Sequence, residues 1–181
     1  VIMLLFQIGG IGIITFALFF AFFLKAGSGI QSQNTLKEMM NTSNLSASKN
    51  LLKQVVILTL VIEAISALLI HSLIGDVFPE TGDRIFNSIF HAISAFCNAG
   101  FSLFSNGLYE DVVRHKYIFH LVIAATIFFG SLGFPAIQDI MGPQKLRERM
   151  KYRWKDWSIS TKIALYSSLS IVALGAIIIF F

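Results

Sequence analysis

The chain has 181 residues, of which 55% are hydrophobic and only 13% are charged. Soluble domains carry about a quarter charged residues, so this composition excludes an ordinary soluble domain and predicts a protein of the lipid bilayer. The net charge of +4 matters through its position along the chain, because basic residues mark the cytoplasmic loops of membrane proteins. The single cysteine, Cys97, excludes an intramolecular disulfide framework and a cysteine-rich metal site.

The first predicted element is a transmembrane helix over residues 2–24. A helix needs about 20 apolar residues to cross a hydrocarbon core of ~30 Å. Three later runs also meet this requirement, and they cover residues 54–74, 117–140 and 163–181. The first run lacks a basic segment before it and a small-residue cleavage site after it, so we expect no signal peptide. Both ends of the chain fall inside apolar runs, and we therefore expect a fragment of a longer protein.

The charges of the connecting segments predict the topology. Lys and Arg outnumber Asp and Glu in residues 25–53 and again in residues 142–162. Both segments are therefore predicted to be cytoplasmic. Residues 75–84 and 105–116, taken together, carry more acidic than basic side chains and are predicted to lie outside.

A fifth apolar run, residues 85–104, lies between the two segments predicted to be outside. The charge pattern is consistent only if this run enters and leaves the membrane on the same face. A helix over residues 85–96 would reach about 18 Å, which is too short to cross, so the rest must return as extended chain. Non-helical backbone at that depth is tolerated only where protein buries it or where it lines a watery cavity. The run is therefore predicted to be a re-entrant pore helix and loop.

The residues after this pore helix have the properties of an ion-selectivity filter. The C-terminal end of a helix carries partial negative charge, which favours a cation and disfavours an anion. The following residues are small or polar and can run extended with their carbonyl groups facing an ion, and Gly100 permits the necessary backbone angles. Taken alone, the glycine would suit an ordinary helix end in a buried loop, but the charge pattern favours the filter. The predicted filter residues are Cys97, Asn98, Ala99, Gly100 and Phe101.

Two predicted helices that run from outside to inside carry similar glycine motifs, which indicates an internal repeat. The glycines are Gly9, Gly10 and Gly12 in the first helix and Gly130 and Gly133 in the third. Repeats around an axis are what an ion pathway in one polypeptide needs, since one pore loop cannot surround an ion. Small residues also permit close helix packing in lipid, so packing and gating both remain open for these glycines. Pro135 predicts a local break in the third span.

Three motifs in this order resemble the Trk/Ktr/HKT superfamily of K⁺ or Na⁺ transport subunits, in particular the bacterial TrkH/KtrB-like proteins. They are Gln7–Ile13, Ser94–Ser102 and Gly130–Pro135, and the resemblance covers essentially the whole chain. It implies an all-α integral membrane fold of four membrane-pore loop-membrane repeats, similar to a K⁺ channel, with one filter glycine in each repeat. Gly100 would be the filter glycine of the second repeat.

The resemblance also divides the chain. Residues 1–24 would be the last helix of the first repeat, residues 54–141 the complete second repeat, and residues 163–181 the first helix of the third. Residues 25–53 would form a cytoplasmic loop and residues 142–162 a basic cytoplasmic linker. Within the second repeat the expected parts are helix 54–74, pore helix 85–96, filter 97–101 and helix 117–141.

The function that the resemblance implies is transport of K⁺, or of Na⁺, across the bacterial inner (plasma) membrane in a Trk/Ktr-type uptake system. No enzyme activity and no cofactor in this chain are expected, and K⁺ is the transported ion. The expected partners are the lipid bilayer, the remaining repeats of the same polypeptide, a second copy in a homodimer, and a cytosolic nucleotide-binding regulatory subunit. No nucleic-acid partner is expected.

Residues 143–157 alternate basic residues with Tyr152, Trp154 and Trp157. This pattern is typical of a helix that lies at the cytoplasmic headgroup boundary. A docking surface for the regulatory subunit is the alternative interpretation.

Three further polar residues, Glu63, Asn87 and His91, are candidates for a structural role or for ion coupling. Glu63 is the one acid in the middle of a predicted span, where a charge is costly unless it is paired or hydrated. We expect it to pair with a neighbouring helix or with Asn87 or His91. The alternative is a proton- or Na⁺-coupled carrier that uses Glu63. An intramembrane enzyme built from Ser94, His91 and Glu63 is less favoured, because the sequence lacks G-x-S-x-G and H-E-x-x-H motifs.

Overall fold

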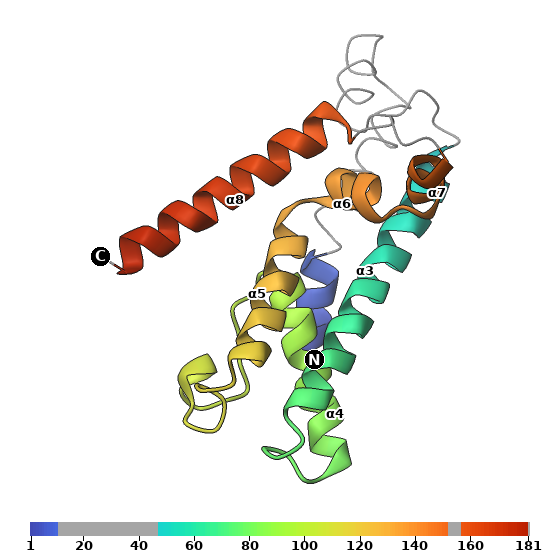
Figure 1. Cartoon of the computed structure of the whole chain (residues 1–181). Coiled ribbons are helices and arrows are strands. Elements are labelled where there is room, and N and C mark those ends of the chain that lie inside the picture. Colours follow the sequence, from blue (N-terminus) through green and yellow to red (C-terminus); the bar gives the residue numbers. More distant parts are fainter. Residues whose placement is uncertain (11–46, 152–156, 181) are drawn as a thin grey trace. The chain divides into compact units, whose positions relative to one another are not determined.

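The computed structural model describes residues 1–10, 47–151 and 157–180 (Figure 1). The regular structure of these residues is entirely helical, with no strand among them, which agrees with the predicted all-α fold. The chain divides into two compact units, Val1–Ser131 and Leu132–Phe181, which are described separately below. The predicted first span beyond Gly10, the loop residues 25–46 and the candidates Gly12, Tyr152 and Trp154 lie outside the described residues.

The first unit is a group of helices around a central shorter one. Its elements are a helix over residues 2–10, α3 (Ala47–Leu73), α4 (Thr81–Phe96), the 3-10 turn η1 (Gly107–Tyr109) and α5 (Tyr117–Ser131). The helices α3 and α5 run antiparallel, and α4 packs against both of them (Figure 1).

The core of the first unit joins α3, α4 and α5. Its fully or almost fully buried members are Ile70, Ile74, Ala92, Ala95, Val113, Phe119 and Ile123. The small side chains of Ala92 and Ala95 let α4 approach its neighbours closely, as is usual for helices packed in lipid. A buried hydrogen bond of 2.8 Å between the hydroxyls of Ser66 and Thr126 links α3 directly to α5.

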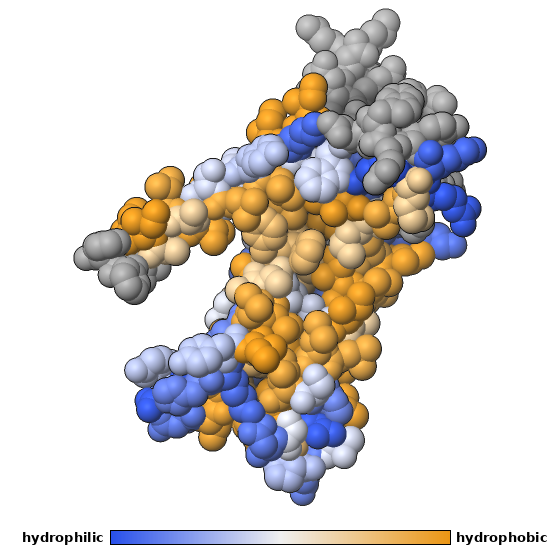
Figure 2. All heavy atoms as spheres, in the orientation of Figure 1, coloured by the Kyte–Doolittle hydropathy of each residue, from blue (hydrophilic) through white to orange (hydrophobic). Residues whose placement is uncertain are grey.

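The outer surface of the unit is apolar where a membrane would surround it. Large hydrophobic side chains such as Leu60, Ile65 and Leu68 are exposed along α3. Figure 2 shows hydrophobic surface over the middle of this unit and hydrophilic surface at the end formed by the loops between α3 and α5. Within α3, Lys53–Leu73 is long and apolar enough to cross a bilayer, so α3 has the properties of a membrane-spanning helix.

The second unit holds α6 (Phe134–Met141), α7 (Pro143–Lys151) and α8 (Ile159–Phe180). In α8, Ile159–Ile178 also meets the length and hydropathy requirements for a span. Ser158 caps α8, because its hydroxyl accepts a hydrogen bond of 3.3 Å from the backbone N–H of Thr161. The backbone N–H of Ser158 in turn donates to the carboxylate of Asp139 at 2.8 Å, which fixes the start of α8 to α6.

Several element boundaries differ from the expected ones. The helix expected over residues 54–74 begins at Ala47, within the predicted loop, and the helix expected over residues 163–181 begins at Ile159. The helix expected over residues 85–96 begins earlier, at Thr81. The helix expected over residues 117–141 is two helices, because α5 ends at Ser131 and α6 begins at Phe134. Gly133, with a φ of 78°, lies at the break, and Pro135 lies in the first turn of α6. Proline lacks the N–H that a continuous helix requires but is suited to a first turn, which explains why a new helix starts there.

Candidate functional site

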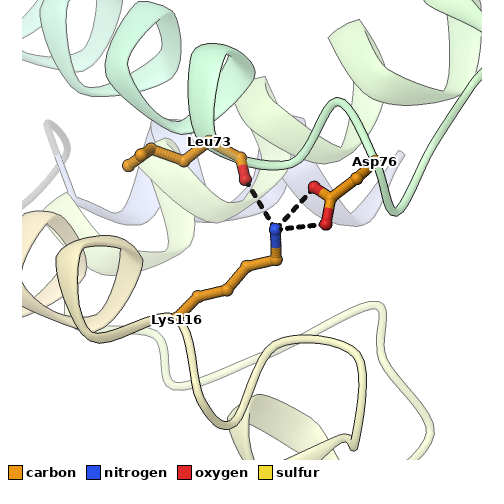
Figure 3. A network of polar contacts seen from close by, with 3 residues as sticks. All are labelled: Leu73, Asp76 and Lys116. Atoms are coloured by element: carbon orange, nitrogen blue, oxygen red, sulfur yellow. Dashed lines mark hydrogen bonds and ion pairs between the residues drawn. The ribbon is translucent and has the colours of Figure 1, made fainter.

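The segment predicted to be re-entrant begins and ends at the same end of the first unit. Lys116, just before α5, donates through Nζ to the two carboxylate oxygens of Asp76 at 2.5 and 2.7 Å and to the carbonyl oxygen of Leu73 at 3.1 Å (Figure 3). The hydrogen bond from Lys116 lowers the pKa of Asp76 below its ordinary value. The end of α3 and the start of α5 are therefore tied together, and residues 77–115 leave and return at this point.

The C-terminal end of α4 closes in a Schellman motif. The backbone N–H of Asn98 donates to the carbonyl of Ala95 at 3.1 Å, and that of Ala99 donates to the carbonyl of Ser94 at 2.9 Å. Asn98 adopts the left-handed conformation, with a φ of 52°. The expectation that residues 97–100 all run extended is therefore wrong for Cys97 and Asn98, because both belong to the turn that ends the helix.

After this turn the chain runs back along α4, held by two side chains of the helix. The hydroxyl of Ser94 donates to the carbonyl of Phe101 at 2.6 Å and accepts from the N–H of the same residue at 3.0 Å. His91 Nε2 lies 3.0 Å from the hydroxyl of Ser102, and His91 Nδ1 lies 2.8 Å from the carbonyl oxygen of Asn87. Because a carbonyl can only accept, Nδ1 carries the proton, and a neutral His91 accepts at Nε2 from Ser102.

Four consecutive carbonyl groups follow α4 without a hydrogen-bond donor from the described part of the chain. They belong to Cys97, Asn98, Ala99 and Gly100. The carbonyl of Phe101, which was also predicted to belong to the filter, is instead occupied by Ser94. Gly100 has a φ of 73°, in the left-handed region, and a β-carbon there would meet open space.

Two glycines from the repeated motifs lie against the end of α4. A β-carbon on Gly10 would overlap the sulfur of Cys97, and a β-carbon on Gly130 would overlap the carbonyl oxygen of Phe96. Gly9, in contrast, has no neighbouring atom within 4 Å of such a β-carbon. The two motifs thus bring their helices into close contact with consecutive residues at the end of α4.

The helix over residues 2–10 also contacts the returning loop. The rings of Phe6 and Phe101 are stacked, with their centroids 4.9 Å apart. Phe6, one turn before Gly10, therefore packs on the segment immediately after Gly100, so this helix covers one side of the loop.

Glu63 pairs with a residue that the sequence motifs did not mark as its partner. Its Oε2 accepts a hydrogen bond of 2.9 Å from the side-chain amide of Gln7. Asn87 instead donates to the carbonyl of Asp83, and His91 bonds as described above. Glu63, His91 and Ser94 each bond to other residues and not to one another, so these three residues do not form the nucleophile and base set considered for an enzyme.

Sequence reasoning also did not foresee that Ser94 and His91 hold the returning loop. A signal was present, because Asn87, His91 and Ser94 recur at helical spacing along α4. All three are buried. Such a stripe indicates a helix face that contacts polar backbone rather than lipid.

Comparison with known proteins identifies the family. Residues 2–181 match the TrkH family, described as "Cation transport protein". The chain belongs to the TrkH family. The predicted family and the predicted membrane fold class are therefore confirmed, and the family is one of ion transport proteins rather than of enzymes.

Several curated relatives are similar to this TrkH-family chain over nearly its whole length. It is 32% identical over 182 residues to "Ktr system potassium uptake protein B" of Bacillus subtilis, covering 99% of this chain and 38% of that protein. It is 32% identical over 181 residues to "Potassium/sodium uptake protein NtpJ" of Enterococcus hirae, covering 99% of this chain and 37% of that protein. The chain thus spans less than two fifths of the length of these relatives.

Proposed function

We propose that this chain supplies one wall of a pathway through which K⁺, or Na⁺, crosses the plasma membrane in a Ktr- or Trk-type uptake system. Related proteins named for potassium uptake and for potassium/sodium uptake support both ions as candidates. The chain carries one complete pore loop, and the remaining repeats would close the pathway around the ion.

The observation that carries this proposal is the set of four carbonyl groups after α4. Cys97, Asn98, Ala99 and Gly100 offer oxygen atoms that accept nothing from the described chain, directly after the negative end of a helix dipole. Asn98 and Gly100 are exposed and Cys97 and Ala99 are half-buried, so this segment is open to a ligand, and a dehydrated cation is a suitable one for carbonyl oxygens. In this role Cys97 contributes its carbonyl, because its thiol lies against Gly10. The carbonyls would replace part of the hydration shell of the ion.

The charges of the connecting segments and the family resemblance also suggest how the chain is oriented in the membrane and which partners it has. The basic segments 25–53 and 142–162 would face the cytoplasm, and the acidic end at Asp76 would face outside. The name of one relative refers to a system, which supports a further component. That this component is a cytosolic nucleotide-binding regulatory subunit is proposed on the family resemblance. A homodimer is proposed on the family resemblance.

A carrier coupled through Glu63 is the second candidate. The hydrogen bond between Glu63 and Gln7 supports a structural pair instead, because it engages the carboxyl group with a neighbouring helix. Neutralising Glu63 would abolish uptake in the coupled carrier and would not do so in the pathway proposed above.

The test uses the full-length parent protein in cells that lack other K⁺ uptake, with growth on limiting K⁺ and Na⁺/K⁺ preference as readouts. Gly100→Ser should reduce K⁺ uptake at least tenfold or change the ion preference. Gly107→Ser is the matched control, because Gly107 also has a positive φ, of 60°, and also has open space around its β-carbon position. An equal effect of the two substitutions, or none from Gly100→Ser, would remove Gly100 from the filter.

A further inference from the structure

Glu63 is the only acidic residue among the buried residues of the described chain, with 5% of its surface exposed. It lies within the part of α3 that is long and apolar enough to cross a bilayer. Thr59 and Ser66, one turn away on either side, are also buried, so one face of α3 presents a polar row to the neighbouring helices. A carboxyl group at such a position requires complete hydrogen bonding.

The bonding of Glu63 and Gln7 is incomplete in a specific way. The amide N–H of Gln7 donates to Oε2 of Glu63 at 2.9 Å. The other oxygen of each group, Oε1 of Gln7 and Oε1 of Glu63, is buried and has no hydrogen-bond partner among the described residues. Both unpaired atoms are acceptors when Glu63 is ionised, so neither can satisfy the other.

One proton on Glu63 would supply the missing donor. A carboxylic acid and a primary amide form a cyclic pair in which the amide N–H donates to one oxygen and the acid O–H donates to the amide oxygen. If the nitrogen and oxygen of the Gln7 amide were exchanged by a flip of the amide group, the amide oxygen would face Oε2 of Glu63. A proton on Glu63 would then again be needed between the two oxygens. No ion pair recorded among the described residues involves Glu63, so no positive side chain there offers an alternative.

The pair lies close to the proposed filter. Gln7 and Gly10 are three residues apart on one face of the same helix, a rise of about 4.5 Å. A β-carbon on Gly10 would overlap the sulfur of Cys97, the first of the four residues in the proposed filter. The contact between Gln7 and Glu63 therefore fixes the helix over residues 2–10 to α3 one turn from the place where that helix supports Cys97.

We propose that Glu63 is held as a neutral carboxylic acid in a two-hydrogen-bond pair with the side-chain amide of Gln7, and that this pair positions the helix over residues 2–10 against Cys97. Glu63 and Gln7 are thus positioning residues and do not touch the ion. The effect on ion uptake rests on the proposed function, whereas the protonation state and the pairing do not.

The first experiment measures the infrared spectrum of the purified full-length parent protein near neutral pH. The wild-type spectrum minus that of Glu63→Gln should contain a carboxylic-acid C=O stretching band. Gln7→Leu, which removes the amide but keeps Glu63, should shift this band. Loss of a carboxylate band instead would overturn the proposal, and would indicate an ionised Glu63 that binds a water molecule or a cation between the two oxygens.

The second experiment compares substitutions by thermal stability and K⁺ uptake. Glu63→Gln can form an amide-amide pair with Gln7 and should keep uptake within about twofold of wild type. Glu63→Leu and Gln7→Leu each leave a buried polar group unpaired, and each should lower the melting temperature and reduce uptake severalfold. Failure of Glu63→Gln to fold or to transport would contradict a neutral pair.

The two proposals can fail separately. A carboxylic-acid band together with a Gly100→Ser variant of normal uptake and ion preference would support the pair and contradict the filter. A carboxylate band together with a Gly100→Ser variant of reduced uptake or changed ion preference would contradict the neutral pair and support the filter.

Discussion

The carbonyl oxygen of Phe96, at the end of α4, lies directly against Gly130 of α5. A β-carbon at Gly130 would overlap that oxygen and would lie 2.9 Å from the carbonyl carbon of Phe96. The obstacle is backbone, which cannot rotate away as a side chain can. The distance between α4 and α5 at this level therefore depends on the absence of a side chain at residue 130.

Gly130→Ala should therefore lower the free energy of unfolding of the full-length protein by about 1–3 kcal/mol, which is the usual cost of overpacking. Phe96 would be displaced, and it immediately precedes the four residues of the proposed filter, so K⁺ uptake should also fall. Melting temperature and uptake measure the two effects. Gly175→Ala is the control, because a β-carbon at Gly175 of α8 meets nothing within 4 Å. Equal behaviour of the two variants would show that the contact with Phe96 is unimportant.

A second prediction separates Gly9 from Gly10. Gly10→Ala should reduce stability and uptake because its β-carbon would overlap the sulfur of Cys97, whereas Gly9→Ala should be neutral or stabilising by up to ~1 kcal/mol from helix propensity. Adding Cys97→Ala to Gly10→Ala should restore part of the loss, since it removes the sulfur and leaves the β-carbon of residue 97, at 3.1 Å, as the nearest neighbouring atom. Failure of this double variant to improve on Gly10→Ala would mean that the helix is held elsewhere.

A third prediction concerns pH and the contact between Asp76 and Lys116. The pKa of Asp76 is lower in the folded protein than its ordinary value of 3.8, chiefly because Lys116 donates a hydrogen bond to the carboxylate. The unfolded chain therefore takes up a proton at Asp76 first as the pH falls. The stabilisation should be fully present above the ordinary pKa and should be lost as the pH falls through the folded value.

The measurement is the melting temperature of wild type and Asp76→Asn across this range of pH. The difference between them should be constant near neutral pH, shrink below the ordinary pKa of 3.8, and also shrink at high salt because the pair is exposed. Asp111→Asn is the control, since the pair between Asp111 and Arg114 lies within one loop and joins no two helices. A difference that persisted unchanged in strong acid would exclude the carboxylate of Asp76 as its source.

The sequence by itself predicted the membrane fold and the folded-back course of the segment around Gly100. Both depend on composition, on the sign of charge in the loops and on the length of an apolar run. These properties follow from the order of residues along the chain and do not require knowledge of which residues meet in space. The motifs also predicted the family, because Gln7–Ile13, Ser94–Ser102 and Gly130–Pro135 occur together and in sequence.

Only the tertiary structure decided which groups meet. Cys97 and Asn98 belong to the turn that ends α4, and the carbonyl of Phe101, the fifth of the predicted filter residues, accepts a hydrogen bond from Ser94. Glu63 pairs with Gln7 and not with Asn87 or His91. Residues far apart in the chain have no periodic relation that a sequence reveals. Their contact depends on how closely the helices approach, and small residues such as Gly10 and Gly130 set that distance only once the helices are packed.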